Sequence, residues 1–234
     1  MIRIENVETI GWEHAIRGMR NPKNSWDKSD SKVCAGREFG LCDNCSEKEK
    51  SDCINDGGYL VGENNLKLMM ALRNAGTDHR KFMRMITVYL DITAPLYWWK
   101  EFDTYKVGTV ANSCSTMHKI HDKEFTLEDF SVERSDMMTQ DVFLQHIIPV
   151  LEIQRKLYLE SKSEKAWNSM IQLLPSSYNQ KRTVMLNYEV LANMYKSRKN
   201  HKLKEWRYFC TWIRDLPYSE LIIGEKEDND GNKN

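Results

Sequence analysis

Hydrophobic and polar positions along this chain predict strands in its first half and helices in its second half. Short runs rich in β-branched or aromatic residues are typical of strands, and they occur at Met1 to Val7, Phe82 to Ile92 and Leu96 to Phe102. Apolar residues three and four positions apart predict helices over Trp12 to Met19, Leu66 to Ala75, Asp141 to Glu160, Lys165 to Leu173, Thr183 to Arg198 and His201 to Leu216. The order lacks a regular βαβ alternation, so we expect an α+β fold with a central sheet packed against long helices.

Residues that break helices mark the ends of these elements. Asn21-Pro22 should end the first helix, Gly76 should cap the second, and Pro149 should kink the long helix in which it lies. Thr126, followed by two acidic residues, predicts a turn into a helix over Phe125 to Phe130. We therefore expect one domain over residues 1–223, with a polar, cysteine-rich insertion at about 31–58 and a disordered tail at 224–234.

Composition excludes several classes of partner. Of the 234 residues, 41% are hydrophobic and 29% are charged, as in soluble globular proteins. Lys+Arg 34 balance Asp+Glu 34, so the basic excess of a general nucleic-acid binder is missing. No apolar run approaches the roughly 18 residues of a membrane span, and the N-terminus lacks the pattern of a secretory signal. We expect a cytoplasmic protein that binds neither nucleic acid nor membrane.

Four of the six cysteines lie close together, at Cys34, Cys42, Cys45 and Cys53. Thiolates two residues apart can share a tetrahedral Zn²⁺, and two further cysteines can complete its shell when the loop folds back. The outer two are single rather than paired, so an idle polar loop and a redox or cluster site stay open as alternatives. Because the insertion has few large apolar residues, a structural zinc would explain how it becomes ordered.

The segment from Ala94 to His118 is the most informative for chemistry. Aromatic residues alternate with charged ones, and a run of hydroxyl and amide side chains follows. The pattern fits a segment that contacts a ligand, and equally an amphipathic strand with a polar exit loop. We interpret Trp98-Trp99 as core rather than as a stacking platform. His118 and His121 are interpreted as part of a polar loop rather than as metal ligands.

Two stretches place several candidate residues in a recognisable order. In the first, His79 precedes Pro95-Leu96-Tyr97, and then come Lys100-Glu101-Phe102, Thr104-Tyr105-Lys106 and Asn112-Ser113-Cys114-Ser115. In the second, Leu174-Pro175 precedes Asn187, Asn193 and Arg198, with His201 and Glu205 beyond. This order resembles the flavin-dependent thymidylate synthases, in which a proline-led strand ends in the hallmark R-H-R-x-x-S-x-N-E-x-S-x-R-Y.

Both motifs depart from the family pattern. Thr104-Tyr105-Lys106 stands where Arg-His-Arg is expected, Ser113 replaces the family glutamate, and Met117-His118 replaces the closing Arg-Tyr. A lysine attracts phosphate as a point charge, without the bidentate fork of an arginine. The changes leave two interpretations open, a divergent enzyme and a nucleotide-binding or protein-interaction relative without turnover.

The resemblance implies a function and a set of roles. It implies reductive methylation of dUMP or a related pyrimidine nucleotide, with methylenetetrahydrofolate as carbon donor, reduced FAD as hydride source and NADPH as reductant of the flavin. No covalent enzyme nucleophile is implied, so no catalytic residue is assigned, and a homotetramer is expected. The substrate-binding candidates are Glu101, Lys106, Ser113, Cys114, Ser115 and Arg198. The FAD-binding candidates are His79, Asn187 and Asn193.

The residues themselves allow simpler interpretations of three of these candidates. His79 has polar neighbours and suits the surface or a helix cap, and Arg198 suits the C-terminus of a helix, where a cation is favourable. Asn187 lies within a predicted helix, where asparagine is unfavourable, which favours a binding role.

Overall fold

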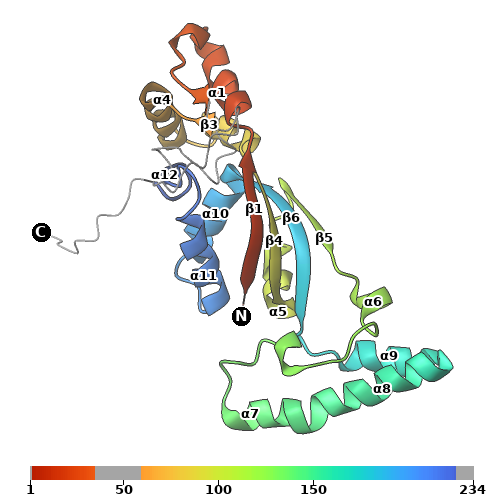
Figure 1. The fold of residues 1–234 in the computed structure, drawn as a ribbon. Coiled ribbons are helices and arrows are strands. Elements are labelled where there is room, and N and C mark those ends of the chain that lie inside the picture. Colours follow the sequence, from red (N-terminus) through yellow and green to blue (C-terminus); the bar gives the residue numbers. More distant parts are fainter. Residues whose placement is uncertain (1, 35–58, 225–234) are drawn as a thin grey trace, which may run out of the picture. The chain divides into compact units, whose positions relative to one another are not determined.

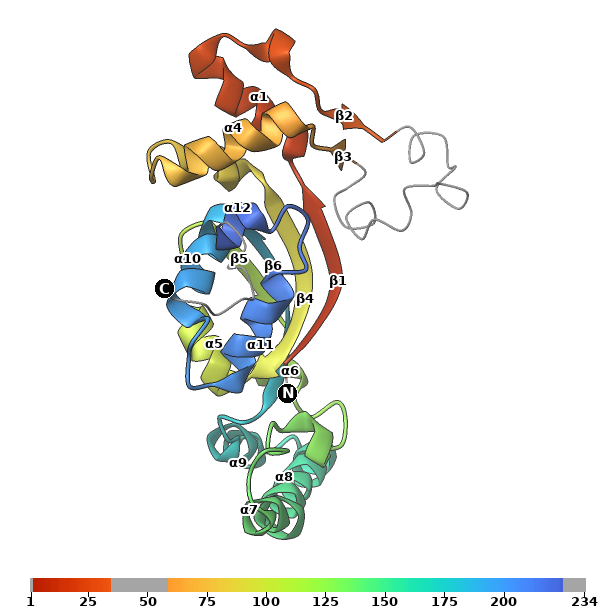
Figure 2. The same cartoon turned by 90° about the vertical axis from the view of Figure 1, so that its left-hand side faces the viewer.

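The computed structural model describes residues 2–34 and 59–224. It divides into two compact units, each described here by itself. The first unit comprises Met1–Glu5, Asp91–Thr104 and Ala111–Thr183, and the second comprises Asn6–Leu90, Tyr105–Val110 and Val184–Asn234. Figure 1 and Figure 2 show the elements from two directions.

A four-stranded antiparallel sheet has the strand order β1-β4-β6-β5. Its strands are β1 (Arg3–Ile10), β4 (Thr87–Pro95), β5 (Thr109–Ser113) and β6 (Asn179–Asn187). Val88, Leu90 and Ile92 of β4 are buried while Tyr89 between them is exposed, because successive side chains of a strand point to opposite faces. The mixture of helices with an antiparallel sheet confirms the predicted α+β class.

The helices of the second unit surround a core rich in aromatic residues and methionine. They are α1 (Trp12–Arg20), α4 (Glu63–Asn74), α10 (Tyr188–Arg198), α11 (Lys204–Ile213) and α12 (Glu220–Ile223), with a 3₁₀ segment at Arg80–Met85. The core includes Trp12, Met69, Tyr188 and Trp206, each fully buried. The helices predicted at Trp12 and Leu66 are confirmed, and the second begins three residues early. Strands β2 (Lys32–Val33) and β3 (Tyr59–Leu60) pair antiparallel, with Lys32 opposite Leu60.

The first unit contains the long helical segment in the second half of the chain. Its elements are α5 (Leu96–Phe102), α6 (Thr116–Lys119), a 3₁₀ turn at Leu127–Asp129, α7 (Met137–Val142), a π-helical stretch at Phe143–Ile147, α8 (Ile148–Ser161) and α9 (Glu164–Leu173). Residues of these helices and of the 120–132 loop share a hydrophobic cluster around Leu151, Met170 and Phe130. The π-helical stretch ends two residues before Pro149, which has no N–H to donate to the preceding turn. The helix is thus irregular near Pro149, while the predicted kink stays a prediction.

The segment Leu96–Phe102 was predicted as a strand and is a helix. Its buried residues are Trp98, Trp99 and Phe102. Trp99 and Phe102 lie one and four positions after Trp98, so all three share one face of a helix. Pro95 ends β4 and occupies the N-cap position, where its missing N–H costs nothing. The high aromatic content suited a strand, but the spacing of the buried rings is helical.

Two other boundaries were also predicted wrongly. The strand expected at Phe82 begins only at Thr87, because a 3₁₀ segment occupies Arg80–Met85. The helix expected from Thr183 begins only at Tyr188, because residues up to Asn187 form β6. Val184 and Leu186 are buried and alternate with Met185, which is the pattern of a strand with one buried face.

Some predictions are not tested by the described residues. Cys42, Cys45 and Cys53 lie outside them, as does the tail after Gly224, while Cys34 is buried. The single domain with an insertion stays a prediction. Among the helices of residues 2–34 and 59–224, none combines the length and the hydropathy that crossing a membrane requires.

Candidate functional site

The candidate residues fall into two groups, one in each unit. The second unit holds the predicted FAD-binding residues together with Lys106 and Arg198, and the first unit holds Glu101, Ser113, Cys114 and Ser115. Glu101 is half-buried on α5, while Ser113 is exposed at the end of β5.

Arg198, the last residue of α10, rests against two aromatic side chains. Its Nε donates a hydrogen bond of 3.0 Å to the hydroxyl of Tyr105. The guanidinium carbon lies 4.9 Å from the ring centroid of Trp206 on α11 and 5.7 Å from that of Tyr105. Such cation–π contacts restrict the orientation of an arginine. The structure thus brings the segment with Tyr105 and Lys106 to the arginine predicted to contact an anion.

A buried thiol lies in the electrostatic field of this arginine. Burial raises the pKa of Cys210 to about 12, while the positive charge of Arg198 acts in the opposite direction. Cys210 is therefore a neutral thiol at physiological pH, and it does not form a thiolate that would compete with a ligand anion for Arg198.

Asn187 caps α10 rather than lying within a helix, which corrects the prediction. Its Oδ1 accepts a hydrogen bond of 3.0 Å from the backbone N–H of Val190. Its Nδ2 lies 2.7 Å from the point that a Cβ at Gly108 would occupy, and Gly108 has a φ of +78°. Only glycine accommodates both the positive φ and this close approach. The asparagine is thus explained by helix capping.

Asn193 belongs to a cluster centred on the buried carboxylate of Glu189. The Oε1 of Glu189 lies 3.3 Å from the Nε of Arg80, and its Oε2 accepts a short hydrogen bond from Arg84. The Nη2 of Arg80 donates to the Oδ1 of Asn193 at 3.2 Å. His79 is exposed at the N-cap of the same 3₁₀ segment. The hydrogen bond to Glu189 raises the pKa of Arg84, so Arg84 stays cationic.

A cavity of about 240 Å³ borders this cluster, and the charged side chains that line it within residues 59–224 are all cationic. They are Arg73, Arg80, Lys196 and Lys199, with Asn193 and Tyr195 beside them. Among the residues that the structure describes, this concave surface carries several cations and no carboxylate, which favours an anion. Sequence analysis missed Arg80 and Arg84, although basic residues directly after His79 could have indicated them.

A larger cavity, of about 600 Å³, lies in the first unit and is lined by Cys114 and Ser115. The N–H of Cys114 donates to the carbonyl of Lys181 at 2.9 Å, and its own carbonyl accepts from Gln180 at 3.0 Å. Ser115 caps α6, because its Oγ accepts from the N–H of His118 at 2.9 Å. Both candidates therefore have a fixed backbone at the cavity wall.

The cations of this larger cavity are already paired with acids. Lys119 lies 3.0 Å from Asp122, Lys181 lies 3.2 Å from Asp91, and Lys123 makes a short contact with Asp129. Burial raises the pKa of Tyr178 to about 12, so this lining residue keeps its proton and can donate a hydrogen bond. The charges that line this cavity are balanced, unlike those of the cationic cavity.

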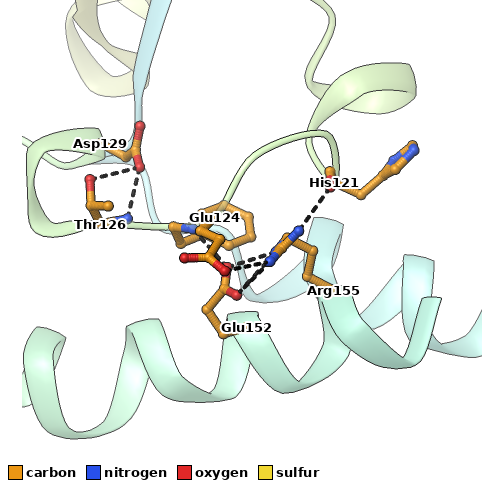
Figure 3. A network of polar contacts seen from close by, with 7 residues as sticks. His121, Glu124, Thr126, Asp129, Glu152 and Arg155 are labelled. Carbon is orange, nitrogen blue, oxygen red and sulfur yellow. Dashed lines mark hydrogen bonds and ion pairs between the residues drawn. The ribbon is translucent and has the colours of Figure 1, made fainter. Parts of the chain in front are cut away.

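The loop that lines the larger cavity is held by a network around Arg155 of α8 (Figure 3). Arg155 donates to both carboxylate oxygens of Glu152, at 2.9 Å and 3.0 Å, and to the carbonyl of His121 at 3.4 Å. Glu152 in turn accepts from the N–H of Phe125 at 2.7 Å. The side chain of Arg155 is only 8% exposed. The network fixes residues 121–125 against the helix and so shapes the cavity wall.

The two histidines near this loop differ in their surroundings. His118 is exposed, and the ring of His121 packs edge-on against Tyr158 at a centroid distance of 4.7 Å. Within residues 2–34 and 59–224, no three histidine, cysteine or acidic side chains converge as metal ligands.

Comparisons with known proteins connect this arrangement to one fold. No protein-family model matches the sequence, and no curated protein matches it. Thymidylate synthase X (ThyX) from Helicobacter pylori, crystallised with FAD and dUMP, superposes with a TM-score of 0.68 at 14% identity, over 96% of this chain and 98% of that chain. A second structure of this flavin-dependent enzyme with FAD and dUMP gives 0.63 at 15% identity, over 94% and 98%. The protein therefore has the ThyX fold.

Proposed function

We propose that the protein binds FAD and a pyrimidine nucleotide and catalyses the reductive methylation of dUMP or a related nucleotide. Methylenetetrahydrofolate would donate the carbon, and NADPH would reduce the flavin. The observation that carries the proposal is Arg198, oriented by Tyr105 and Trp206 in a fold shared almost end to end with enzymes crystallised with FAD and dUMP.

The donors of the second unit fit a flavin dinucleotide. A pyrophosphate needs cationic and N–H donors, and Arg80, Lys196, Lys199 and the amide of Asn193 line one cationic cavity. His79 and Asn187 would contact the same cofactor. When bound, FAD would supply the hydride that completes the methyl group.

The proposed roles of the other residues come from the family resemblance. Arg198 and Lys106 would hold anionic groups of the nucleotide, and Glu101 together with Ser113, Cys114 and Ser115 would contact the substrate. Without a covalent nucleophile, the rate must come from positioning and from preorganised charge. The guanidinium of Arg198 is suited to that task because its orientation has to change little when an anion binds.

A second candidate function is nucleotide binding or protein interaction without turnover. One observation favours it: Glu189 is buried between Arg80 and Arg84, where it weakens their attraction for phosphate. Both candidates use the same fold and differ in whether FAD binds and product forms.

Flavin content and turnover distinguish the two functions. We expect protein incubated with FAD and then desalted to keep flavin absorbance near one FAD per chain, and to form dTMP when dUMP, methylenetetrahydrofolate and NADPH are added. Lys106→Ala should weaken dUMP binding about 10-fold or more, the range for a charge-assisted contact. Exposed Lys100 on α5 provides the control, and Lys100→Ala should bind dUMP as the parent does.

Other outcomes have defined meanings. Binding of dUMP in calorimetry without retained flavin or dTMP would favour the non-catalytic function. Absence of both FAD and dUMP binding at millimolar ligand would contradict the enzyme and the nucleotide-binding function, and would leave protein interaction alone.

The cysteine-rich insertion stays a prediction, and we propose that Cys34, Cys42, Cys45 and Cys53 bind one structural Zn²⁺. Protein purified without chelator or nickel should contain about one zinc per chain by mass spectrometry, since four thiolates bind zinc with on the order of 10 kcal/mol. Replacing Cys42 and Cys45 together by Ser should remove the metal, whereas Cys114→Ser should retain it. Less than about a tenth of a zinc per chain, with the thiols titrating freely, would contradict the proposal.

A further inference from the structure

Arg20, the last residue of α1, is a buried cation whose partners carry no charge. Only 4% of it is exposed. Its Nε donates to the Oδ1 of Asn65 at 2.7 Å, its Nη1 to the carbonyl of Ser25 at 3.0 Å, and its Nη2 to the carbonyl of Lys28 at 2.9 Å. Every acceptor that Arg20 has within residues 2–34 and 59–224 is neutral. Buried charges are usually paired, so the charge of Arg20 is hydrogen-bonded but not compensated.

Arg155 of α8 shows the usual arrangement for comparison. It is buried as well, and its Nε lies 2.9 Å from the carboxylate of Glu152. Removing a guanidinium from water costs several kcal/mol, and a nearby anion offsets most of that cost. The carboxylate at Arg155 comes from the chain itself. At Arg20 the uncompensated charge indicates an anion supplied from outside the chain.

A cavity of about 800 Å³ borders Arg20. The other residues that line it are Lys23, Ser25, Lys28, Asn64 and Leu68. We call it the Arg20 cavity. Among the residues that the structure describes, it is lined by three cations and by no carboxylate, and both lysines are exposed. A concave surface with one sign of charge concentrates ions of the opposite sign.

The two acids nearest in sequence to the lysines do not cancel this charge. Asp30 caps the start of α4, because its Oδ2 accepts from the N–H of Asn64 at 2.7 Å and its Oδ1 from the N–H of Asn65 at 3.1 Å. Its charge is therefore directed at the helix N-terminus. Asp27 is exposed and does not line the cavity.

The loop that carries the lysines is anchored at its base by Asn65. This asparagine is fully buried, and its Nδ2 donates to the Oγ of Ser29 at 2.9 Å and to the Oγ of Ser31 at 2.6 Å. Its Oδ1 accepts from Arg20, which in turn holds two carbonyls of the same loop. The backbone of the loop is thus fixed before a ligand arrives, which lowers the entropy lost on binding.

We propose that the Arg20 cavity binds the phosphate group of a small phosphorylated ligand. A phosphate dianion can accept from an arginine and from several lysines at once. The cavity is much larger than one phosphate, and Leu68 gives it an apolar wall for the rest of the ligand. It shares no lining residue with the cationic cavity at Arg73, so the inference does not depend on the proposed flavin chemistry.

Calorimetric titration with inorganic pyrophosphate tests the site. The titration uses the full chain carrying Lys196→Ala and Lys199→Ala, which removes two cations of the cationic cavity. Failure of the flavin proposal therefore leaves the result unaffected. At low ionic strength this chain should bind one pyrophosphate with a dissociation constant of about 1 mM or lower. Inorganic phosphate should bind more weakly, because it carries less charge.

Lysine substitutions assign the binding to the Arg20 cavity. Adding Lys23→Ala and Lys28→Ala should weaken pyrophosphate binding about 10-fold or more, the range for lost charge-assisted contacts. Lys28→Ala keeps the carbonyl that holds Arg20. The matched control adds Lys32→Ala and Lys67→Ala, which removes the same charge at two exposed lysines outside the cavity, so binding should be unchanged. Circular dichroism verifies that each variant is folded.

Three results would overturn the proposal. The first is no saturable heat at about 10 mM pyrophosphate, well above the expected dissociation constant. The second is an equal loss of affinity in the control, which would assign the binding to the charge of the whole surface. The third is a short single-stranded DNA that binds about 10-fold tighter than pyrophosphate and depends on Lys23 and Lys28, which would assign the cavity to a nucleic-acid backbone.

Discussion

Arg155→Ala is expected to lower the free energy of unfolding by about 3–5 kcal/mol, the range for removing one partner of a buried ion pair. Arg155 is 8% exposed and Glu152 is 17% exposed, so the variant leaves a largely buried carboxylate without its cation. The carbonyl of His121 also loses a donor. Urea denaturation followed by far-UV circular dichroism measures the change.

Two further variants separate charge from helix propensity. Lys156→Ala, at the exposed next position of α8, should change stability by less than about 0.5 kcal/mol. Arg155→Met combined with Glu152→Gln removes both charges and keeps an amide acceptor for the N–H of Phe125. The double variant should recover more than half of the loss, since the penalty comes from the unpaired carboxylate. A single variant as stable as the parent would show that the network contributes little.

Arg198→Ala is expected to weaken dUMP binding about 10- to 100-fold, corresponding to about 1.5–3 kcal/mol for a charge-assisted contact. Arg198→Lys should restore only part of the affinity, because a lysine keeps the charge but loses the planar stacking on Trp206 and the Nε donor to Tyr105. Isothermal titration calorimetry measures all three affinities.

The control is an arginine on the neighbouring helix. Arg207 of α11 is exposed and donates to the carbonyl of His201, so Arg207→Ala should bind dUMP like the parent. Equal affinities in Arg198→Ala and the parent would remove the main support for a nucleotide site at this position.

The sequence predicted most helices because an amphipathic helix repeats its apolar positions over several turns. It failed at Leu96–Phe102, where seven residues give too few turns to distinguish helical from strand spacing. It also failed at Asn187, because β6 continues directly into α10 and the apolar residues of strand and helix form one run. In that run the asparagine itself marked the boundary, since it is a preferred N-cap.

The candidate site was only partly predictable for a different reason. Arg198, Asn193 and Lys106 were singled out by their order along the chain, but their neighbours come from distant segments. Glu189 lies buried against Arg80 and Arg84, more than a hundred residues earlier, and no local pattern connects them. Likewise, the apolar spacing of its helix predicts Trp206 as an ordinary core residue and does not reveal its contact with Arg198. Contacts of this kind depend on tertiary packing, which spacing within one element does not encode.

Tyr105 and Trp206, the two aromatic residues that contact Arg198, affect the entropy of anion binding at this arginine. Fixing a flexible, exposed arginine side chain on ligand binding costs about 1.5–2 kcal/mol in lost rotamer entropy. Tyr105 and Trp206 already restrict Arg198 in the folded chain, so most of that loss occurs during folding rather than on binding. Affinity for an anion at this position therefore depends as much on the two rings as on the charge. A change at either ring would weaken binding through disorder of the arginine, with no contact to the ligand removed.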